Sequence, residues 1–314
     1  MKRLAGVNLT TGSTIAAIDM GSNSFHLLIA RQTEVEPSLA YRAEYRTERK
    51  VQLAAGSELG VLQADAQARA LACLAEFKEI LAAYRPVILR IVATASLRGV
   101  ANAADFCEQV KHLLGVEPEI ISGEREAELV YLGVAAPCDI DQLVVDIGGG
   151  STELALGCGQ VLGQGLSVAV GCLSYLRYFP AGRLERADFD AATAAARAEF
   201  ELAAASLSKP SRLQFIGCSG TLLAVEQVLM ARNGRGRGIR LAELQELATD
   251  LQSFASLGAI SYQGLTEDRQ SIFASGVAIV LALFGALNIE EMQLSEQGLR
   301  EGVVKSYLLA ASAD

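Results

Sequence analysis

The chain has 314 residues, a length that accommodates two domains of ordinary size. Its hydrophobic content of 51% and charged content of 20% indicate a globular protein with a large core and exclude a disordered one. The net charge of −9 argues against a general nucleic-acid binder, although a local basic cleft for a phosphorylated ligand stays compatible with it.

Cysteine and histidine usage argues against the common metal frameworks. The six cysteines form no C-x-x-C pair, and the two histidines are His26 and His112. We therefore expect reduced, mostly buried thiols in a cytoplasmic protein. Residues 4–14 lack the apolar region of a secretory signal. The apolar run 272–287 is shorter than the ~20 residues of a membrane span, so we expect a buried core helix and no membrane contact.

The first half of the chain alternates between strand-like and helix-like segments. Strands are predicted at 14–19, 25–31, 38–45, 87–94 and 119–122, and helices at 63–84, 102–114 and 124–134. Asn102 is the expected N-cap of its helix, and Gly115 is the expected stop.

The second half repeats this plan. Strands are predicted at 142–146, 152–156, 160–169, 213–217 and 292–294, and helices at 186–207, 219–230, over most of 241–287, and at 298–311. This alternation predicts an α/β layer architecture.

One short frame occurs twice, as IDMGSNSFHLLI from residue 18 and as VDIGGGSTELAL from residue 145. Both copies have an Asp at the end of an apolar strand, a turn of the form D-x-G-x-x-S, and a second strand. Asp19 corresponds to Asp146 and Gly21 to Gly148. An Asp at the end of an apolar strand is costly unless it is used. The repeat therefore suggests duplicated domains that face each other across a cleft.

The chemistry of the two turns suits a phosphate chain. Glycines allow close backbone approach, and successive amides form an anion-binding nest. Hydroxyl donors are added by Ser22, Ser24, Ser151 and Thr152. The two Asp residues suit Mg²⁺, which prefers one or two carboxylates together with phosphate oxygens and water. Two ordinary hairpin turns are the structural alternative.

Seven segments carry a resemblance to a known family. They are IDMGSNSFHLLIA at 18–30, ATASLRGVAN at 93–102, IISGEREAELVYLGV at 120–134, VVDIGGGSTELAL at 144–156, VGCLSYLRYFP at 170–180, GCSGT at 217–221 and LSEQGLREGV at 294–303. Over nearly its whole length the chain resembles the exopolyphosphatase and guanosine pentaphosphate phosphohydrolase family, within the superfamily of sugar kinases, actin and heat-shock ATPases.

The resemblance implies a fold of two actin-like (ribonuclease H-like) α/β domains with an active cleft between them. The first domain would comprise residues 1–124 together with 299–314, and the second residues 125–298. The last helix would pack back on the first domain. Longer family members carry extra helical domains after this point, which we expect this chain to lack, so high processivity is in doubt. A homodimer is expected by analogy only.

The catalytic residues follow from chemistry and resemblance together. Phosphoanhydride hydrolysis needs an in-line water, neutralised charge and a carboxylate base. Glu126 lies near a helix start, and the resemblance makes it the general base; one of several exposed helix acids is the alternative. Asp146 and Glu153 would complete the catalytic set and hold the metal, with Asp19 as a weaker ligand. The expected cofactor is Mg²⁺, with Mn²⁺ as a substitute.

The remaining predicted residues bind phosphate. Arg98 would grip it bidentately, and the amide of Gly148 would reach the terminal phosphate. Ser219 either contacts a nucleoside or phosphate or simply caps a helix. The predicted phosphate ligands are Gly21, Ser22, Asn23, Ser24, Arg98, Gly148, Gly149, Gly150, Ser151, Ser219 and Gly220.

Inorganic polyphosphate is the first-choice substrate, and guanosine pentaphosphate is the close alternative. A non-catalytic sensor of polyphosphate or of guanosine tetra- and pentaphosphate, an actin-like polymer and a kinase are the rivals from other classes. The arginine-rich stretch 232–240 would either guide a polyanion or form a solvated loop. Residues Arg46, Arg49 and Lys50 raise the same question, whereas His26 follows strand periodicity and is predicted to be structural.

Overall fold

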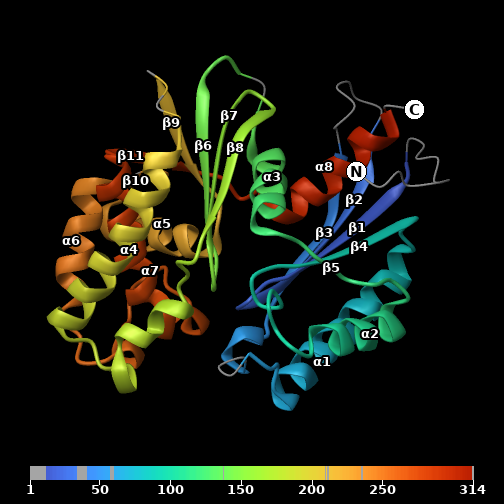
Figure 1. Cartoon of the computed structure of the whole chain (residues 1–314), viewed down its shortest axis with the longest axis horizontal. Helices are drawn as coiled ribbons and strands as arrows, with labels where there is room; N and C mark the ends of the chain where they lie inside the picture. Colours follow the sequence, from blue (N-terminus) through green and yellow to red (C-terminus); the bar gives the residue numbers. More distant parts are fainter. Residues whose placement is uncertain are drawn as a thin grey trace. The chain divides into compact units, whose positions relative to one another are not determined.

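Figure 1 shows the computed structural model of the chain, which describes residues 12–33, 41–56, 60–136, 138–208, 210, 212–234 and 236–312. The chain divides into two compact units, Met1–Gly133 with Leu299–Asp314, and Val134–Gly298. Our sequence-based division after Glu124 lies earlier, so helix α3 (Gly123–Val134) groups with the first unit in all but its last residue. Each unit contains its own sheet and helices, and the α/β class is confirmed.

The first unit is built on a five-stranded sheet in the order β3-β2-β1-β4-β5. Its strands are β1 (Thr14–Met20), β2 (Ser24–Gln32), β3 (Tyr41–Lys50), β4 (Ile88–Ala93) and β5 (Glu119–Ile120). The first three strands form an antiparallel meander, and β4 and β5 extend the sheet in parallel from β1. The central strands read as apolar runs because both of their faces are buried.

Helices cover both faces of this sheet (Figure 1). Alternate residues of β1, such as Ile18, form one core with α1 (Ala64–Tyr84) and α2 (Ala103–Leu114). The residues between them, such as Ala17, are equally buried but lie outside that core. Helix α8 (Leu299–Ser312) contacts β1 and β2 from this second side.

Helix α8 also holds α3. A Cβ atom at Gly302 would overlap the carbonyl of Leu129, so the two helices touch at the backbone. The Nζ of Lys305 donates to the carbonyl of Gly133 at 2.8 Å, close to the C-terminal end of α3. This end of a helix carries partial negative charge, which the ammonium group complements.

The second unit has a six-stranded sheet in the order β10-β11-β9-β6-β7-β8. Its strands are β6 (Asp141–Ile147), β7 (Thr152–Cys158), β8 (Val161–Val168), β9 (Leu213–Gly217), β10 (Ile239–Arg240) and β11 (Glu291–Leu294). Again three strands form an antiparallel meander, and β9 and β11 follow β6 in parallel.

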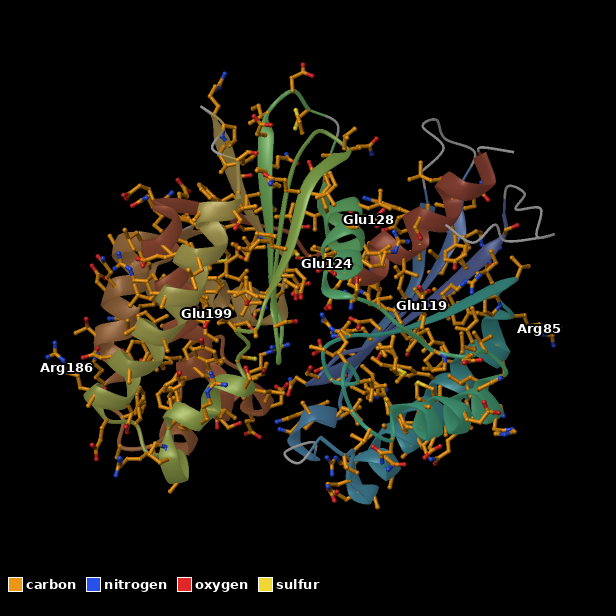
Figure 2. The ribbon with its side chains drawn as sticks, in the orientation of Figure 1. Arg85, Glu119, Glu124, Glu128, Arg186 and Glu199 are labelled. Carbon is orange, nitrogen blue, oxygen red and sulfur yellow. The ribbon has the colours of Figure 1, made fainter. Side chains whose placement is uncertain are left out.

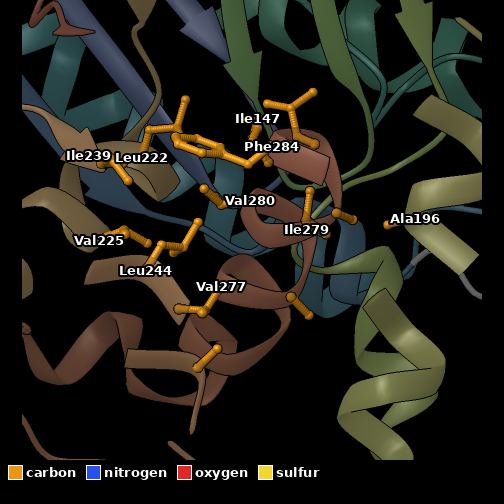
Figure 3. Close-up of a cluster of buried hydrophobic side chains, with 14 of the residues drawn as sticks. Ile147, Ala196, Leu222, Val225, Ile239, Leu244, Val277, Ile279, Val280 and Phe284 are labelled. Carbon is orange, nitrogen blue, oxygen red and sulfur yellow. The ribbon is translucent and has the colours of Figure 1, made fainter. Parts of the chain in front are cut away.

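One large core joins this sheet to its helices, α4 (Arg186–Ser206), α5 (Gly220–Asn233), α6 (Leu241–Leu251) and α7 (Gln270–Leu287). Figure 3 shows Val277, Val280 and Phe284 of α7 at its centre, beside Ile147 of β6. Within the described residues, one segment, Glu267–Leu287, is long and apolar enough to cross a membrane, and 67% of its apolar window is buried in the structure. The expectation of a core helix is confirmed.

The predicted duplication is visible in the topology. In each unit the first strand pairs antiparallel with the second and parallel with the fourth or its equivalent. The registers also agree, because Asp19 lies opposite His26 and Asp146 lies opposite Glu153, in each case seven residues further on. Both D-x-G-x-x-S frames are therefore the same kind of hairpin at the same edge of equivalent sheets.

Two local expectations were wrong. The side chain of Asn102 does not cap α2; its Oδ1 accepts from the Leu62 amide at 2.8 Å and its Nδ2 donates to the Leu62 carbonyl at 2.9 Å. Strand β3 continues to Lys50, because its charged residues occupy an edge strand that pairs along the length of β2. The predicted start of this strand, residues 38–40, lies outside the described residues.

Candidate active site

The hairpin loop of the first unit, Gly21–Ser24, is held by backbone bonds from the segment after β3. The carbonyl of Ser22 accepts from the amide of Ala54 at 3.1 Å. The carbonyl of Asn23 accepts from the amides of Val51 and Gln52 at 2.9 and 2.7 Å. Gly21 is required because a Cβ atom there would lie 2.8 Å from the carbonyl oxygen of Ser24.

The loop of the second unit, Gly148–Ser151, is fixed by the same device. The carbonyl of Gly148 accepts from the amide of Cys172 at 3.0 Å, and the carbonyl of Gly149 accepts from those of Leu173 and Ser174 at 2.9 and 3.1 Å. These donors follow β8, just as the donors of the first loop follow β3. The sequence-based prediction of two equivalent loops did not include these anchoring segments.

Gly171 lets the anchor approach the second loop. A Cβ atom at this position would overlap the backbone of Gly149 and Gly150. The motif VGCLSY at 170–175 therefore acts through its backbone, and the glycine is the sequence signal by which the anchor could have been found.

The anchors decide where the loop amides point. Because the peptide N–H and C=O of one planar unit point in opposite directions, the amides of Gly149 and Gly150 face away from the anchor. We expected the amide of Gly148 to reach the terminal phosphate. It donates instead to the carbonyl of Ser151 at 2.9 Å, within the hairpin. An anion at this loop would therefore be received by the amides that follow Gly148.

Asp146 and Glu153 face each other across the antiparallel pair of β6 and β7. Glu153 is buried, and its Oε1 accepts from the hydroxyls of Ser151 and Ser167, both at 2.8 Å. The Ser151 hydroxyl therefore donates its hydrogen bond to Glu153. Ser167 is a second donor to this carboxylate, and the sequence analysis did not identify it. Burial raises the pKa of Asp146 from 3.8 to about 6.

These carboxylates fit a hard divalent cation. Two neighbouring acids at a strand end, beside a loop that receives anions, match the one or two carboxylates that Mg²⁺ takes with water and phosphate oxygens. Within the part of the chain that is described, no group of three or more His, Cys, Asp and Glu side chains forms a fuller cage. The raised pKa of Asp146 agrees with a carboxylate that a positive charge would stabilise.

Glu126 and Arg98 form an ion pair in the first unit, between the guanidinium Nη2 and the carboxylate Oε2. Ser122 begins helix α3, since its hydroxyl accepts from the amide of Arg125 at 3.2 Å and its carbonyl from that of Glu126 at 2.9 Å. Glu126 is buried at 7% exposure. In Figure 2 the other acids of this helix, Glu124 and Glu128, lie along α3 at its surface.

The remaining acid of the repeat lies in the first unit. Asp19 pairs in register with His26, whose Nδ1 lies 2.9 Å from Arg300 of α8 and 4.0 Å from Glu48 of β3. Arg300 also binds the buried Glu301, which is 3.5 Å from Arg46. His26 therefore joins a charged cluster that ties α8 to the sheet, which supports its structural interpretation.

Ser219 caps helix α5, as its hydroxyl accepts from the amide of Leu222 at 3.2 Å. A glycine is favoured at the neighbouring position, Gly220, because a Cβ atom there would overlap the guanidinium of Arg269. Arg269 was not predicted as a site residue. It lines a small cavity between α5 and α7 with apolar side chains that include Val225 and Phe273. An arginine directly before an apolar helix was the available signal.

The arginine-rich stretch after α5 is partly neutralised. Arg232 pairs with Asp250 at 2.8 Å, Arg237 with the buried Glu226 at 3.4 Å, and Arg240 with Glu291 at 3.5 Å. Arg235 lies outside the described residues. The ion pairs do not favour the polyanion-guiding interpretation of the other three arginines.

Comparison with known proteins identifies the family and the fold. The model of the Ppx/GppA phosphatase family matches residues 28–311. An exopolyphosphatase from Cytophaga hutchinsonii is 25% identical, with a TM-score of 0.81 over 94% of this chain and 98% of that one. A Ppx/GppA family member from Aquifex aeolicus is 23% identical, with a TM-score of 0.77 over 95% and 98% of the two chains, and shows the same fold.

Proposed function

The chain belongs to the Ppx/GppA phosphatase family, and we propose that it is an exopolyphosphatase that releases terminal orthophosphate from inorganic polyphosphate. The observation that carries the proposal is the pairing of buried Glu126 with Arg98 at the start of α3. A carboxylate beside a guanidinium, at a helix end that attracts anions, suits a base that works next to a bound phosphate.

In the proposed reaction a water attacks the terminal phosphorus while its proton passes to Glu126. The new bond is between phosphorus and the water oxygen, and the bond that breaks joins phosphorus to the bridging oxygen. The products are orthophosphate and a chain shortened by one unit. Arg98 would give up part of its contact with Glu126 and bind the phosphate instead. This exchange would free the Glu126 carboxylate and position the substrate.

Asp146 and Glu153 would hold Mg²⁺, or Mn²⁺ in its place. When bound, the ion would supply charge neutralisation at the phosphate oxygens. The hydroxyls of Ser151 and Ser167 donate to the Glu153 carboxylate and so fix its orientation. The anchored loops would offer fixed amides, so that little reorganisation is needed as charge develops.

Hydrolysis of the 5′ γ-phosphate of guanosine pentaphosphate is the second candidate. The same loops, with Glu126 and Arg98, would serve its terminal phosphate, whereas the cavity at α5, with a volume of about 10 Å³, is too small for a purine. The similar protein from Cytophaga hutchinsonii is an exopolyphosphatase, which supports the first candidate.

Phosphate release from polyphosphate and from guanosine pentaphosphate, with Mg²⁺, tests both candidates. We expect Glu126→Gln to lower kcat by about 10²–10⁴-fold. Glu128→Gln, on the exposed face of the same helix, is the matched control and should retain activity. Release only from guanosine pentaphosphate would replace the first substrate with the second.

A binding assay separates catalysis from sensing. If the wild-type protein releases nothing but binds either compound tightly, the chain is a sensor and Glu126 has no role as a base. An actin-like polymer would instead sediment, and a kinase would form ATP from ADP and polyphosphate.

A further inference from the structure

Helix α7 carries a buried hydroxyl group to which the proposed reaction assigns no part. The helix runs through the core of the second unit (Figure 3), and its other buried residues are apolar or glycine. Ser275 has an exposure of 0%. Its Oγ lies 2.7 Å from the carbonyl oxygen of Cys172 and 2.8 Å from that of Ile272. A polar group in such a core is costly unless it is hydrogen-bonded, so the choice between these two partners matters.

The Cys172 carbonyl needs this hydroxyl more than the Ile272 carbonyl does. Ile272 lies in the first turn of α7, where the helical pattern supplies the amide of Gly276 as a donor. Cys172 is buried outside any helix or strand, and no backbone amide of the described residues donates to its carbonyl. A buried carbonyl without a donor is destabilising. The single proton of the Ser275 hydroxyl therefore goes to Cys172.

This bond reaches the second loop through two peptide units. The Cys172 carbonyl and the Leu173 amide belong to one planar unit and point in opposite directions. The Leu173 amide donates to the carbonyl of Gly149 at 2.9 Å. That carbonyl shares the next planar unit with the amide of Gly150, which faces away from the anchor. The donors therefore follow one direction, from the Ser275 hydroxyl to the Gly150 amide.

We propose that Ser275 is a positioning residue for the anion-receiving amide of Gly150. The hydroxyl fixes the peptide that anchors the loop, and it polarises the hydrogen-bond chain so that the last amide becomes a stronger donor. Each bond in such a chain strengthens its neighbours by about 10–30%. The inference rests on the proposed function in one respect, namely that the substrate phosphate is received at this loop.

A parallel chain ends at the amide of Gly149 and has a backbone donor at its start. The Tyr175 amide donates to the carbonyl of Gly171 at 3.0 Å, and the Cys172 amide of that peptide unit donates to the carbonyl of Gly148 at 3.0 Å. The Gly149 amide lies on the far side of this last carbonyl. It serves as an internal reference, because loss of the hydroxyl on α7 leaves this second chain complete.

Amide proton shifts of Gly149 and Gly150 during titration with inorganic phosphate test the proposal without hydrolysis. In the wild-type protein we expect both protons to shift. In Ser275→Ala the shift of Gly150 should shrink relative to that of Gly149, because its chain has lost the first donor. Ser306→Ala removes a hydroxyl that bonds the carbonyl of Val303 in its own helix at 2.7 Å. It is the matched control and should leave both shifts unchanged.

Steady-state kinetics on polyphosphate gives the matching test of activity. We expect Ser275→Ala to lower kcat about 10-fold, less than the about 10²–10³-fold loss of a direct oxyanion donor. KM should change less than kcat, because the amide meets charge that develops in the transition state. Ser275→Cys keeps a weak S–H donor and should lie between wild type and Ser275→Ala. It carries the same comparison if Ser275→Ala does not fold.

The outcomes separate this inference from the proposed function. A wild-type protein whose Gly150 amide shifts with phosphate, but which releases none from polyphosphate, would contradict the proposed function and leave the hydrogen-bond chain to be judged by the shifts. A Gly150 amide that does not respond to phosphate, or responds equally in wild type and Ser275→Ala, would overturn the positioning role. An equal loss of shift at Gly149 and Gly150 would also overturn it, because the hydroxyl would then only support the fold.

Discussion

Glu126 and Arg98 illustrate how much a single residue's role depends on its neighbour. Chain position and the SGxxEA segment identify Glu126, and the SLRG segment identifies Arg98, but neither indicates that the two side chains pair. In the absence of ligand each satisfies the other, which limits the cost of burying a charge. A phosphate that competes for Arg98 would therefore also release the Glu126 carboxylate for its proposed role as the base.

Asp146 gives the clearest dependence of stability on pH. Burial raises its pKa from 3.8 to about 6, so between these values the folded protein binds more protons than the unfolded chain. Stability of the metal-free protein should then fall as the pH rises from about 4 to about 6 and stay lower above that range. Asp146→Asn removes this loss, on the order of 1–3 kcal/mol.

Thermal unfolding in EDTA at pH 4.5 and pH 7.5 checks this prediction. Asp146→Asn should melt at a higher temperature than wild type at pH 7.5, with a smaller difference at pH 4.5. Asp190→Asn, on the exposed face of α4, serves as the control. A difference that does not change with pH would contradict the assigned cause.

At the scale of elements, the hairpins could be predicted and their supports could not. The two D-x-G-x-x-S frames identified the strands, the turns and their equivalence. The bonds from Cys172 and Leu173, and from Val51 and Gln52, join residues that lie 24 to 29 positions apart in the chain and share no motif. The prediction that Asn102 caps its helix was wrong for a related reason. Its side chain forms hydrogen bonds with Leu62, forty positions earlier in the chain.

Gly171→Ala tests the support of the second loop. A methyl group would displace Gly149 and Gly150, and with them the amides that we propose receive the substrate phosphate. A misplacement of about 1 Å can cost about 10²-fold in rate, so we expect kcat to fall by that order. Gly163→Ala on β8, where the nearest atom to the new Cβ is 3.4 Å away, is the control. Equal activity of the two variants would show that the loop does not need this anchor.

Gly302→Ala tests the contact between α8 and α3. The new methyl group would overlap the carbonyl of Leu129, so the helices must separate. Overpacking of this kind costs about 1–3 kcal/mol, to be measured by urea unfolding. Gly258→Ala, with no atom within 4 Å, should be nearly neutral. Because Glu126 lies on α3, activity should fall with stability in the first variant only.

At the scale of the whole chain, the duplication and the α/β class could be derived from the repeat and from the alternation of elements. The boundary between the two compact units could not be derived in this way. Helix α3 groups with the first unit through its contacts with α8 at Gly302 and Lys305, which the sequence does not reveal. The two units also differ in how the chain builds them. The second is one continuous segment, whereas the first needs residues from both ends of the chain.

This difference predicts how fragments behave. Residues 134–298 contain a complete sheet and its core, so this fragment should fold alone. Residues 1–133 lack α8, and the sheet face that includes Ile15 and Ala17 would be uncovered. Burial of such side chains contributes about 25 cal/mol per Å², so this fragment should not fold until residues 299–314 are joined to it.

Far-UV circular dichroism during urea unfolding is the suitable measurement, since the chain contains no Trp. A cooperative transition is expected for 134–298, and for 1–133 only when 299–314 is attached by a flexible linker. If 134–298 is unfolded alone, its core depends on the remainder of the chain. If 1–133 folds without α8, the last helix supports α3 and the Arg98–Glu126 pair rather than the sheet itself.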